Sequence, residues 1–223
     1  MQNTLSIFED RKQELLVYFS ILSDIDNGNI IINNNKSHFI KILKSNYLLM
    51  LYNLVEACIV SGIVEIYEGL KNDNCTYDGV IDEIKQLWTN YQITQIYGPT
   101  TQKITYQRRV KEIIDNITQH NQILLSRNIL KDISGNLDAR KIKQLCDKHR
   151  IRYCARDDTS ALETVKTKRN SLAHGDISFS NCARDLTLTD LDNIKNAVEQ
   201  FMGDILNGMQ TYYNEKQYKL IRA

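Results

Sequence analysis

The residues most able to do chemistry in this sequence are Arg169, Asn170 and His174, which stand close together. An arginine side chain keeps its positive charge at physiological pH and offers a planar fork of hydrogen-bond donors. A histidine can take up or release a proton near neutral pH. The pattern therefore indicates acid–base chemistry beside a permanent positive charge, with a polar side chain directly after the arginine.

The segment that carries this cluster is expected to be a helix that presents Arg169 on its apolar side. Leu162, Val165 and Leu172 form an apolar stripe, and at 100° per residue Arg169 falls on the same stripe. A guanidinium that faces a protein core is rarely tolerated without a partner or a function. The position of Arg169 therefore calls for an explanation.

His174 is expected at the end of this helix, because Gly175 is well placed as the residue that follows the last helical turn. On an ideal helix His174 would lie about 140° away from Arg169, but helical side-chain directions no longer apply at the cap. A purely structural explanation also stays open. In it the histidine interacts favourably with the helix dipole and the arginine extends its charged end to solvent.

The other histidines and the cysteines show no pattern of a metal site. Cys146 and His149 share a helix face and precede Cys154, but the spacing matches no standard zinc pattern, so buried or free thiols are predicted. His120 falls on the apolar stripe of another predicted helix and is expected to be buried or half-buried. The sequence lacks GxGxxG, GxxxxGK(S/T), HExxH and GxSxG. No metal and no cofactor are predicted.

The charges of the chain balance, but they are unevenly distributed. Lysine plus arginine number 28 and aspartate plus glutamate 27, so net charge alone predicts no polyanionic partner. Residues 139–156, however, contain seven basic residues and one acid, a local net charge of +6. One strongly basic surface is therefore compatible with a nearly neutral chain.

Composition and hydropathy favour a cytoplasmic protein. The five cysteines include no CxxC pair, and the first residues lack the features of a signal peptide, so reduced thiols are expected. The most apolar stretch, residues 48–64, is interrupted by Asn53 and Glu56 and is shorter than the roughly 20 residues that a membrane-spanning helix needs. It is expected to form a buried helix, and no membrane partner is predicted.

The spacing of apolar residues predicts an all-α bundle with a long central helix and little or no sheet, forming a single domain over residues 1–223. Thr189 and Asp190 are expected to open the last helix in an arrangement close to a capping box, and residues 94–105, with Gly98 and Pro99, are expected to be a loop. The helices are predicted over about 5–25, from 37 or 45 to 70, 80–91, 110–124, 138–149, 159–173 and 189–209.

These elements and the cluster together resemble the HEPN superfamily, whose hallmark is an arginine, a polar residue and a histidine on a late helix of an all-α bundle. The resemblance is closest to a bacterial stand-alone subfamily associated with defence and mobile-element loci. It rests on LYNLVEA at 51–57, GNLDARKI at 135–142 and VKTKRNSLAHGDISF at 165–179.

The resemblance implies a metal-independent endoribonuclease that works as a homodimer, with two copies of the motif facing each other across a cleft. Arg169 and His174 would be the catalytic pair and Asn170 the supporting polar residue. His174 would act as general base or acid in attack of a ribose 2′-hydroxyl on the adjacent phosphate. Glu56 is a possible supporting residue from the central helix; alternatively, it is an acid satisfied by a basic neighbour inside the bundle.

The resemblance further implies a toxin or antiviral effector, with an antitoxin or defence-system protein as a possible partner. Lys143 and Arg150 of the basic segment 139–156, together with Lys166 and Lys168, are expected to guide RNA to the cleft. The alternative for a run of basic residues is a solvent-exposed face with no binding role. The alternative function is a non-catalytic helical module that binds RNA or a partner protein.

Overall fold

The computed structural model describes residues 1–94, 103–130, 135–154 and 159–220. These residues form eight α-helices and two 3-10 helices, with no β-strand among them, so the predicted all-α fold is confirmed. The helices are α1 (Gln2–Asn27), α2 (Lys36–Asn72), η1 (Tyr77–Gly79), α3 (Asp82–Thr94), α4 (Lys103–Thr118), η2 (Arg127–Leu130), α5 (Ala139–His149), α6 (Ser160–Ala173), α7 (Phe179–Cys182) and α8 (Leu188–Asn214).

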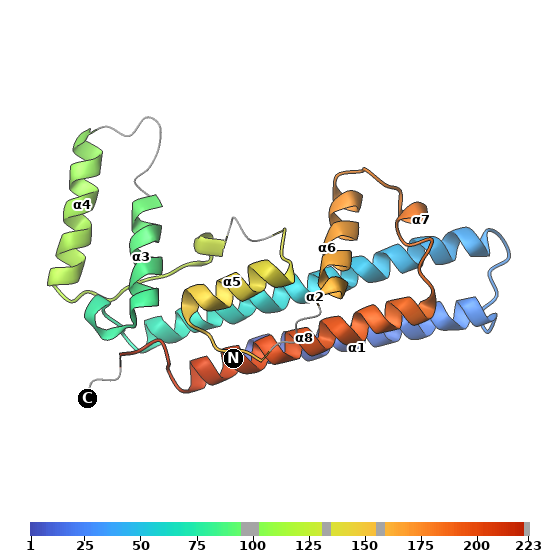
Figure 1. Ribbon diagram of the computed structural model, residues 1–223, viewed down its shortest axis with the longest axis horizontal. Coiled ribbons are helices and arrows are strands. Elements are labelled where there is room, and N and C mark those ends of the chain that lie inside the picture. The colour runs from blue at the N-terminus through green and yellow to red at the C-terminus, as the bar shows by residue number, and fades with distance from the viewer. Residues whose placement is uncertain (95–102, 131–134, 155–158, 221–223) are drawn as a thin grey trace.

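The long helix α2 is the centre of the bundle, as predicted. It packs against α1, α6, α7 and α8, and α1, α2 and α8 run lengthwise beside one another in Figure 1. By length and composition α2 is also the one described helix that could cross a membrane. The core helix of a helical bundle meets the same criteria, and the contacts of α2 are those of a core helix.

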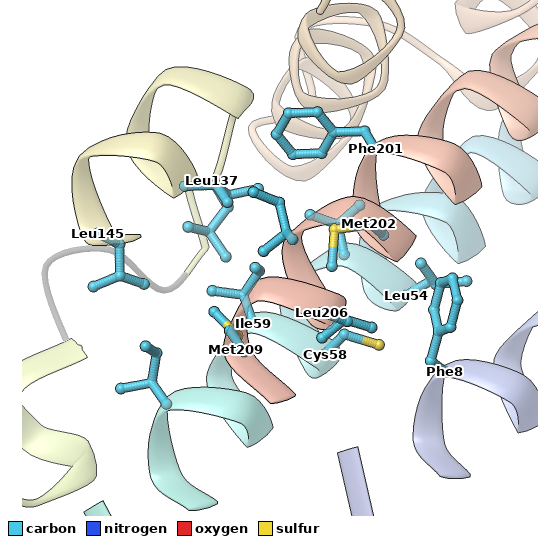
Figure 2. Close-up of a cluster of buried hydrophobic side chains, with 14 of the residues drawn as sticks. Phe8, Leu54, Cys58, Ile59, Leu137, Leu145, Phe201, Met202, Leu206 and Met209 are labelled. Carbon is cyan, nitrogen blue, oxygen red and sulfur yellow. The ribbon is translucent and has the colours of Figure 1, made fainter. Parts of the chain in front are cut away.

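The core lies where α1, α2, α5 and α8 meet. Figure 2 shows Phe8 of α1, Leu54 and Cys58 of α2 and Met202 and Leu206 of α8 in one apolar cluster, with Leu137 and Leu145 reaching it from the α5 side. All of these side chains are at most 7% exposed. Burial of this surface removes apolar area from water and stabilises the arrangement of the helices that carry the site.

Several helix ends differ from the sequence prediction. The last helix begins at Leu188, because Thr187, and not Thr189, is its N-cap and forms a full capping box with Asp190.

Helix α4 ends at Thr118, so His120 does not lie on a helical stripe. It adopts a left-handed backbone conformation with φ of 52°, is 70% exposed and lies 3.0 Å from Asp78. The prediction that His120 is buried or half-buried is therefore wrong. Of the predicted loop 94–105, residues 95–102, with Gly98 and Pro99, lie outside the described residues. The described part of this range is helical, because α3 extends to Thr94 and α4 begins at Lys103, so the loop prediction is wrong there.

Gly208 allows helix α8 to approach the segment that follows α5. A Cβ atom at position 208 would collide with the carbonyl oxygen of Arg152 and crowd the backbone of Tyr153. Gly203, five residues earlier on the same helix, has open space around it. The two glycines therefore have different roles: only Gly208 is required by a close contact between backbones.

We expect Gly208→Ala to lower the free energy of unfolding by about 1–3 kcal/mol, because the added methyl group forces two backbones apart. The control is Gly203→Ala, which should raise the free energy of unfolding by about 0.5–1 kcal/mol through helix propensity. Urea denaturation of both variants measures the difference. If Gly208→Ala is as stable as Gly203→Ala, the close approach of Arg152 to α8 does not constrain the fold.

Candidate functional site

Helix α6 presents the motif, and its sequence explains where it begins and ends. Leu162 and Val165 are buried and direct one side of α6 toward the bundle. The helix ends at Ala173 with His174 as C-cap, and Gly175 follows with a φ of 75°, which a glycine adopts without strain. The predicted helix end at Gly175 is confirmed.

Arg169 is half-buried and is held by partners on three sides. Its Nη1 donates hydrogen bonds to the Gly135 carbonyl oxygen at 2.8 Å and to Asn170 Oδ1 at 3.1 Å. The guanidinium lies over the ring of Tyr52, with 4.7 Å between Cζ and the ring centroid. A cation over an aromatic face is attracted by the ring's quadrupole. The arginine predicted on the apolar side of α6 is thus accommodated through specific contacts.

Helix α2 supplies the other wall of the site through Tyr52 and Glu56, which lie one turn apart. Glu56 Oε1 accepts a hydrogen bond from the Gly135 backbone nitrogen at 2.9 Å, and the Tyr52 hydroxyl accepts one from the Leu137 nitrogen at 3.0 Å. Burial raises the pKa of Tyr52 above its ordinary value, against the opposing effect of the hydrogen bond from Leu137 N. Residues 135–137 are therefore clamped between α2 and α6.

Gly135 is the centre of this clamp. Glu56 binds its N–H group and Arg169 binds its carbonyl group. Its φ of 82° is one that glycine adopts far more readily than other residues. The structure thus brings Glu56 and Arg169 to opposite sides of one peptide segment.

Asn170 connects the motif to the next residue of this segment. Its Oδ1 accepts from Arg169, and its Nδ2 donates to Asn136 Oδ1 at 3.4 Å. The amide therefore helps to fix the orientation of the guanidinium relative to residues 135–137. This geometry is compatible with the supporting role predicted for Asn170.

His174 is separate from these contacts. Its side chain is exposed, and among the described residues it makes no hydrogen bond or ion pair. Only its backbone is tied to the motif, through a 3.0 Å hydrogen bond from its nitrogen to the Asn170 carbonyl oxygen. The site therefore combines a fixed, half-buried guanidinium with an imidazole that faces solvent.

The four predicted RNA-binding cations lie in different surroundings. Lys166 is 18% exposed, and its Nζ lies 2.7 Å from Asp138 Oδ2 and 3.6 Å from Glu163 Oε1, so it joins α6 to the N-cap of α5. Lys168 and Lys143 are half-buried. Arg150 is exposed at the opposite end of α5, with 4.0 Å between its Nη1 and the nearest carboxylate oxygen, on Glu83.

The sequence pattern predicted no role for Tyr52 or Gly135. Both lie inside the blocks on which the family resemblance rests, which is the one signal that could have singled them out. A cation over a ring and a carbonyl acceptor are contacts between segments far apart in the chain. No spacing rule within one helix reveals them.

Cys146 and His149, two of the three candidates for a metal site, are buried in the bundle. Both ring nitrogens of His149 are engaged, Nε2 with the Tyr67 hydroxyl at 2.9 Å and Nδ1 with the Leu145 carbonyl oxygen at 2.7 Å. Burial lowers the pKa of His149 to about 4 and raises that of Cys146 to about 12. Cys154 is a free thiol at the surface, and the predicted free thiols are confirmed. The described residues contain no group of three His, Cys, Asp or Glu side chains that would hold a metal.

One comparison with known proteins gives a match. A family model described as HEPN_MAE_28990:/-like HEPN matches residues 2–218, which is nearly the whole chain. No curated protein and no solved structure matches the chain. The predicted resemblance to the HEPN superfamily is therefore confirmed.

The ion pair between Asp138 and Lys166 makes stability depend on pH. Burial alone would raise the pKa of the Asp138 carboxyl, but hydrogen bonds from Lys166 Nζ and Lys141 N outweigh it and hold this pKa below its ordinary value. A carboxyl with a lowered pKa stabilises the fold above its unfolded pKa of about 4 and loses this effect as pH falls through its folded pKa.

We therefore expect Asp138→Asn to lower the free energy of unfolding at pH 7 by about 1–3 kcal/mol. The deficit should shrink as pH falls below about 4, because the unfolded carboxyl becomes protonated there while the native carboxyl, whose pKa is lowered, stays ionised to a lower pH. Urea denaturation of the parent and of Asp138→Asn between pH 7 and pH 3 measures this difference in the free energy of unfolding. Asp185→Asn, at a carboxylate that is 83% exposed, is the control and should have little effect. A deficit for Asp138→Asn that stays constant to pH 3 would contradict this assignment.

Proposed function

Because the chain belongs to the HEPN family, we propose that it is a metal-independent endoribonuclease. HEPN domains are typically ribonucleases. The observation that carries the proposal is the geometry of the motif: Arg169 is held in place by Gly135 and Tyr52, and the His174 imidazole, five residues later, is exposed.

In the proposed reaction, the 2′-oxygen of a ribose attacks the adjacent phosphorus atom. A histidine removes the proton of the 2′-hydroxyl, the bond from phosphorus to the 5′-oxygen of the next nucleotide breaks, and that oxygen takes up a proton. The products are a 2′,3′-cyclic phosphate and a 5′-hydroxyl end. Histidine suits both proton transfers because its ordinary pKa lies near neutral pH, and such catalysis typically contributes 10² to 10⁴ in rate.

Arg169 would stabilise the charge that develops on the phosphoryl oxygens. An arginine carries five N–H donors, and its contacts with described residues use Nη1. In the proposed reaction, Nε and Nη2, which have no hydrogen bond to a described residue, would donate to a phosphate. A guanidinium that is already oriented loses little conformational entropy when it binds the substrate.

The proposed active form is a homodimer with the motif at its two-fold axis. One chain offers a single exposed histidine in the motif, whereas the reaction needs one group to accept a proton and another to donate one. An isologous contact doubles the set of groups, so that His174 and the partner subunit's His174 would share the two proton transfers.

In the cell we propose a cytoplasmic toxin or antiviral effector that an antitoxin or another defence protein regulates. Lys168, Lys143 and Arg150 would contact RNA phosphates. Lys166 forms an ion pair with Asp138, so its contribution to RNA binding would be the weakest of the four. The non-catalytic binding module remains the alternative outcome of the test below.

We expect His174→Ala and Arg169→Lys each to reduce cleavage of single-stranded RNA at least about 100-fold. The first removes the proton-transfer group, and the second replaces the planar fork by a point charge. EDTA should not affect the parent protein. Mass spectrometry of the fragments should show cyclic phosphate ends.

His38→Ala is the matched control for the histidine variant, since His38 is exposed on the first turn of α2, and it should cleave normally. Circular dichroism verifies that all variants are folded. If EDTA abolishes cleavage, or if His174→Ala cuts at the parental rate, the proposed mechanism is wrong. A folded parent that binds RNA but never cuts it would favour the binding module.

We expect the purified protein to be a dimer of about twice 25.9 kDa when its mass is measured by light scattering after gel filtration. His174→Ala should keep this mass, because the change leaves the backbone cap of α6 intact. A parent that is monomeric at the concentration at which it cleaves RNA would contradict a shared site.

A further inference from the structure

A basic groove lies at the end of the bundle where α3 and the C-terminal segment are found (Figure 1). It has a volume of about 560 Å³. Four cations line it, Arg150, Arg152, Lys216 and Lys219, and Glu215 is the single acid of its lining. We call it the C-terminal groove.

The cations of the groove come from two segments that the fold brings together. Arg150 is the C-cap of α5 with a φ of 60°, and Arg152 follows two residues later. The backbone at Arg152 is pressed against Gly208 of α8. The chain direction at both arginines is therefore set by the packing of helices, not by a free loop.

The lysine side of the groove is fixed by backbone pairing near the C-terminus. Ile81 N donates to Tyr218 O and Leu220 N donates to Gly79 O, both at 3.0 Å. Tyr218 between the lysines is 1% exposed, and its hydroxyl donates to Asp73 Oδ2 at 2.9 Å. This pairing fixes the backbone of the segment that carries Lys216 and Lys219.

Acidic neighbours neutralise only part of this charge. Asp73 binds Lys216 at 2.7 Å and Lys219 at 2.9 Å. Arg150 lies 4.0 Å from Glu83 and is 58% exposed, and Arg152 has no ion pair among the described residues. Arginine binds phosphate through its planar fork, and a cleft with an excess of one sign of charge concentrates ions of the opposite sign.

The groove also has an apolar part that suits more than a bare anion. Ile81 lies in its lining, and Leu220, which is 42% exposed, borders the same space. An aliphatic surface beside a guanidinium accommodates the sugar and base that accompany a phosphate group. A nucleotide thus satisfies both parts of the groove.

We propose that the C-terminal groove binds the phosphate group of a nucleotide, either within an RNA strand or as a free nucleotide. The RNA form rests on the proposed ribonuclease function. Helix α5 links the two sites: Asp138 at its start binds Lys166 of the motif helix, and Arg150 ends it in the groove. Its 11 residues span about 16 Å, a distance that a few nucleotides of one strand cover.

The test compares Arg152→Glu with Arg108→Glu, an equal change of charge at a side chain that is 67% exposed on α4 and outside the groove. Each protein is titrated with a fluorescent 2′-O-methyl RNA octamer, which lacks the attacking hydroxyl and cannot be cut, and separately with AMP. For RNA we expect Arg152→Glu, but not Arg108→Glu, to lose about tenfold in affinity. The slope of the logarithm of the binding constant against the logarithm of the salt concentration should also be smaller in magnitude by about 0.7 or more. Circular dichroism verifies folding, and Arg152→Gln replaces the variant if reversal disturbs it.

Loss of RNA affinity in the Arg152 variant alone supports the RNA form of the proposal. Unchanged RNA affinity with weakened AMP binding supports the free-nucleotide form. If Arg152→Glu changes neither, or if Arg108→Glu has the same effect, the proposal is overturned. Cleavage assays on the parent keep the two hypotheses apart: an inactive parent with a working groove refutes only the ribonuclease function, and an active parent without the groove effect refutes only this inference.

Discussion

A permanent positive charge on the bundle side of α6 is the constraint around which the candidate site is built. The charge of Arg169 cannot be removed by a proton shift, since an arginine does not lose its proton in a protein. It therefore needs a carbonyl acceptor and an aromatic face, which Gly135 and Tyr52 provide. The acceptor in turn needs a fixed position, and Glu56 of the central helix provides it by binding the N–H of the same glycine.

This arrangement divides the motif into a rigid part and an accessible part. Arg169 and Asn170 are held against residues 135–137, whereas His174 stands at the exposed end of α6. Groups that stabilise charge act best when they are oriented before the reaction, because no reorganisation is then needed. A group that transfers protons must instead meet the substrate. The burial of the two residues agrees with the separate roles proposed for them.

The basic charge of residues 139–156 is also divided by the fold. Lys143 lies within α5, while Arg150 and Arg152 stand at its far end and join two lysines from near the C-terminus. On the α6 side, Lys166 is taken up by the carboxylate that caps α5. The described cations of this run thus lie partly along α5 and partly at its C-terminal end, where they meet cations from another segment.

The sequence by itself determined the helical class, the central position of α2, the N-cap Asp138, the end of α6 at Gly175 and the family. Each of these follows from local patterns: apolar spacing, capping side chains, a glycine after a helix, and three blocks of similarity. The tertiary structure alone decided that Tyr52, Glu56 and Gly135 surround Arg169, and that Lys216 and Lys219 join Arg150 and Arg152. Arg169 is 34 positions from Gly135 and 117 positions from Tyr52 in the sequence. In the C-terminal groove, the lysines and the arginines are at least 64 positions apart.

The wrong prediction for His120 also arose because tertiary contacts cannot be read from spacing. The apolar spacing extends beyond Thr118, but the backbone adopts a left-handed conformation at His120, and the side chain lies in solvent beside Asp78. Periodicity describes one helix at a time, whereas the partners of a charge are set by how helices pack.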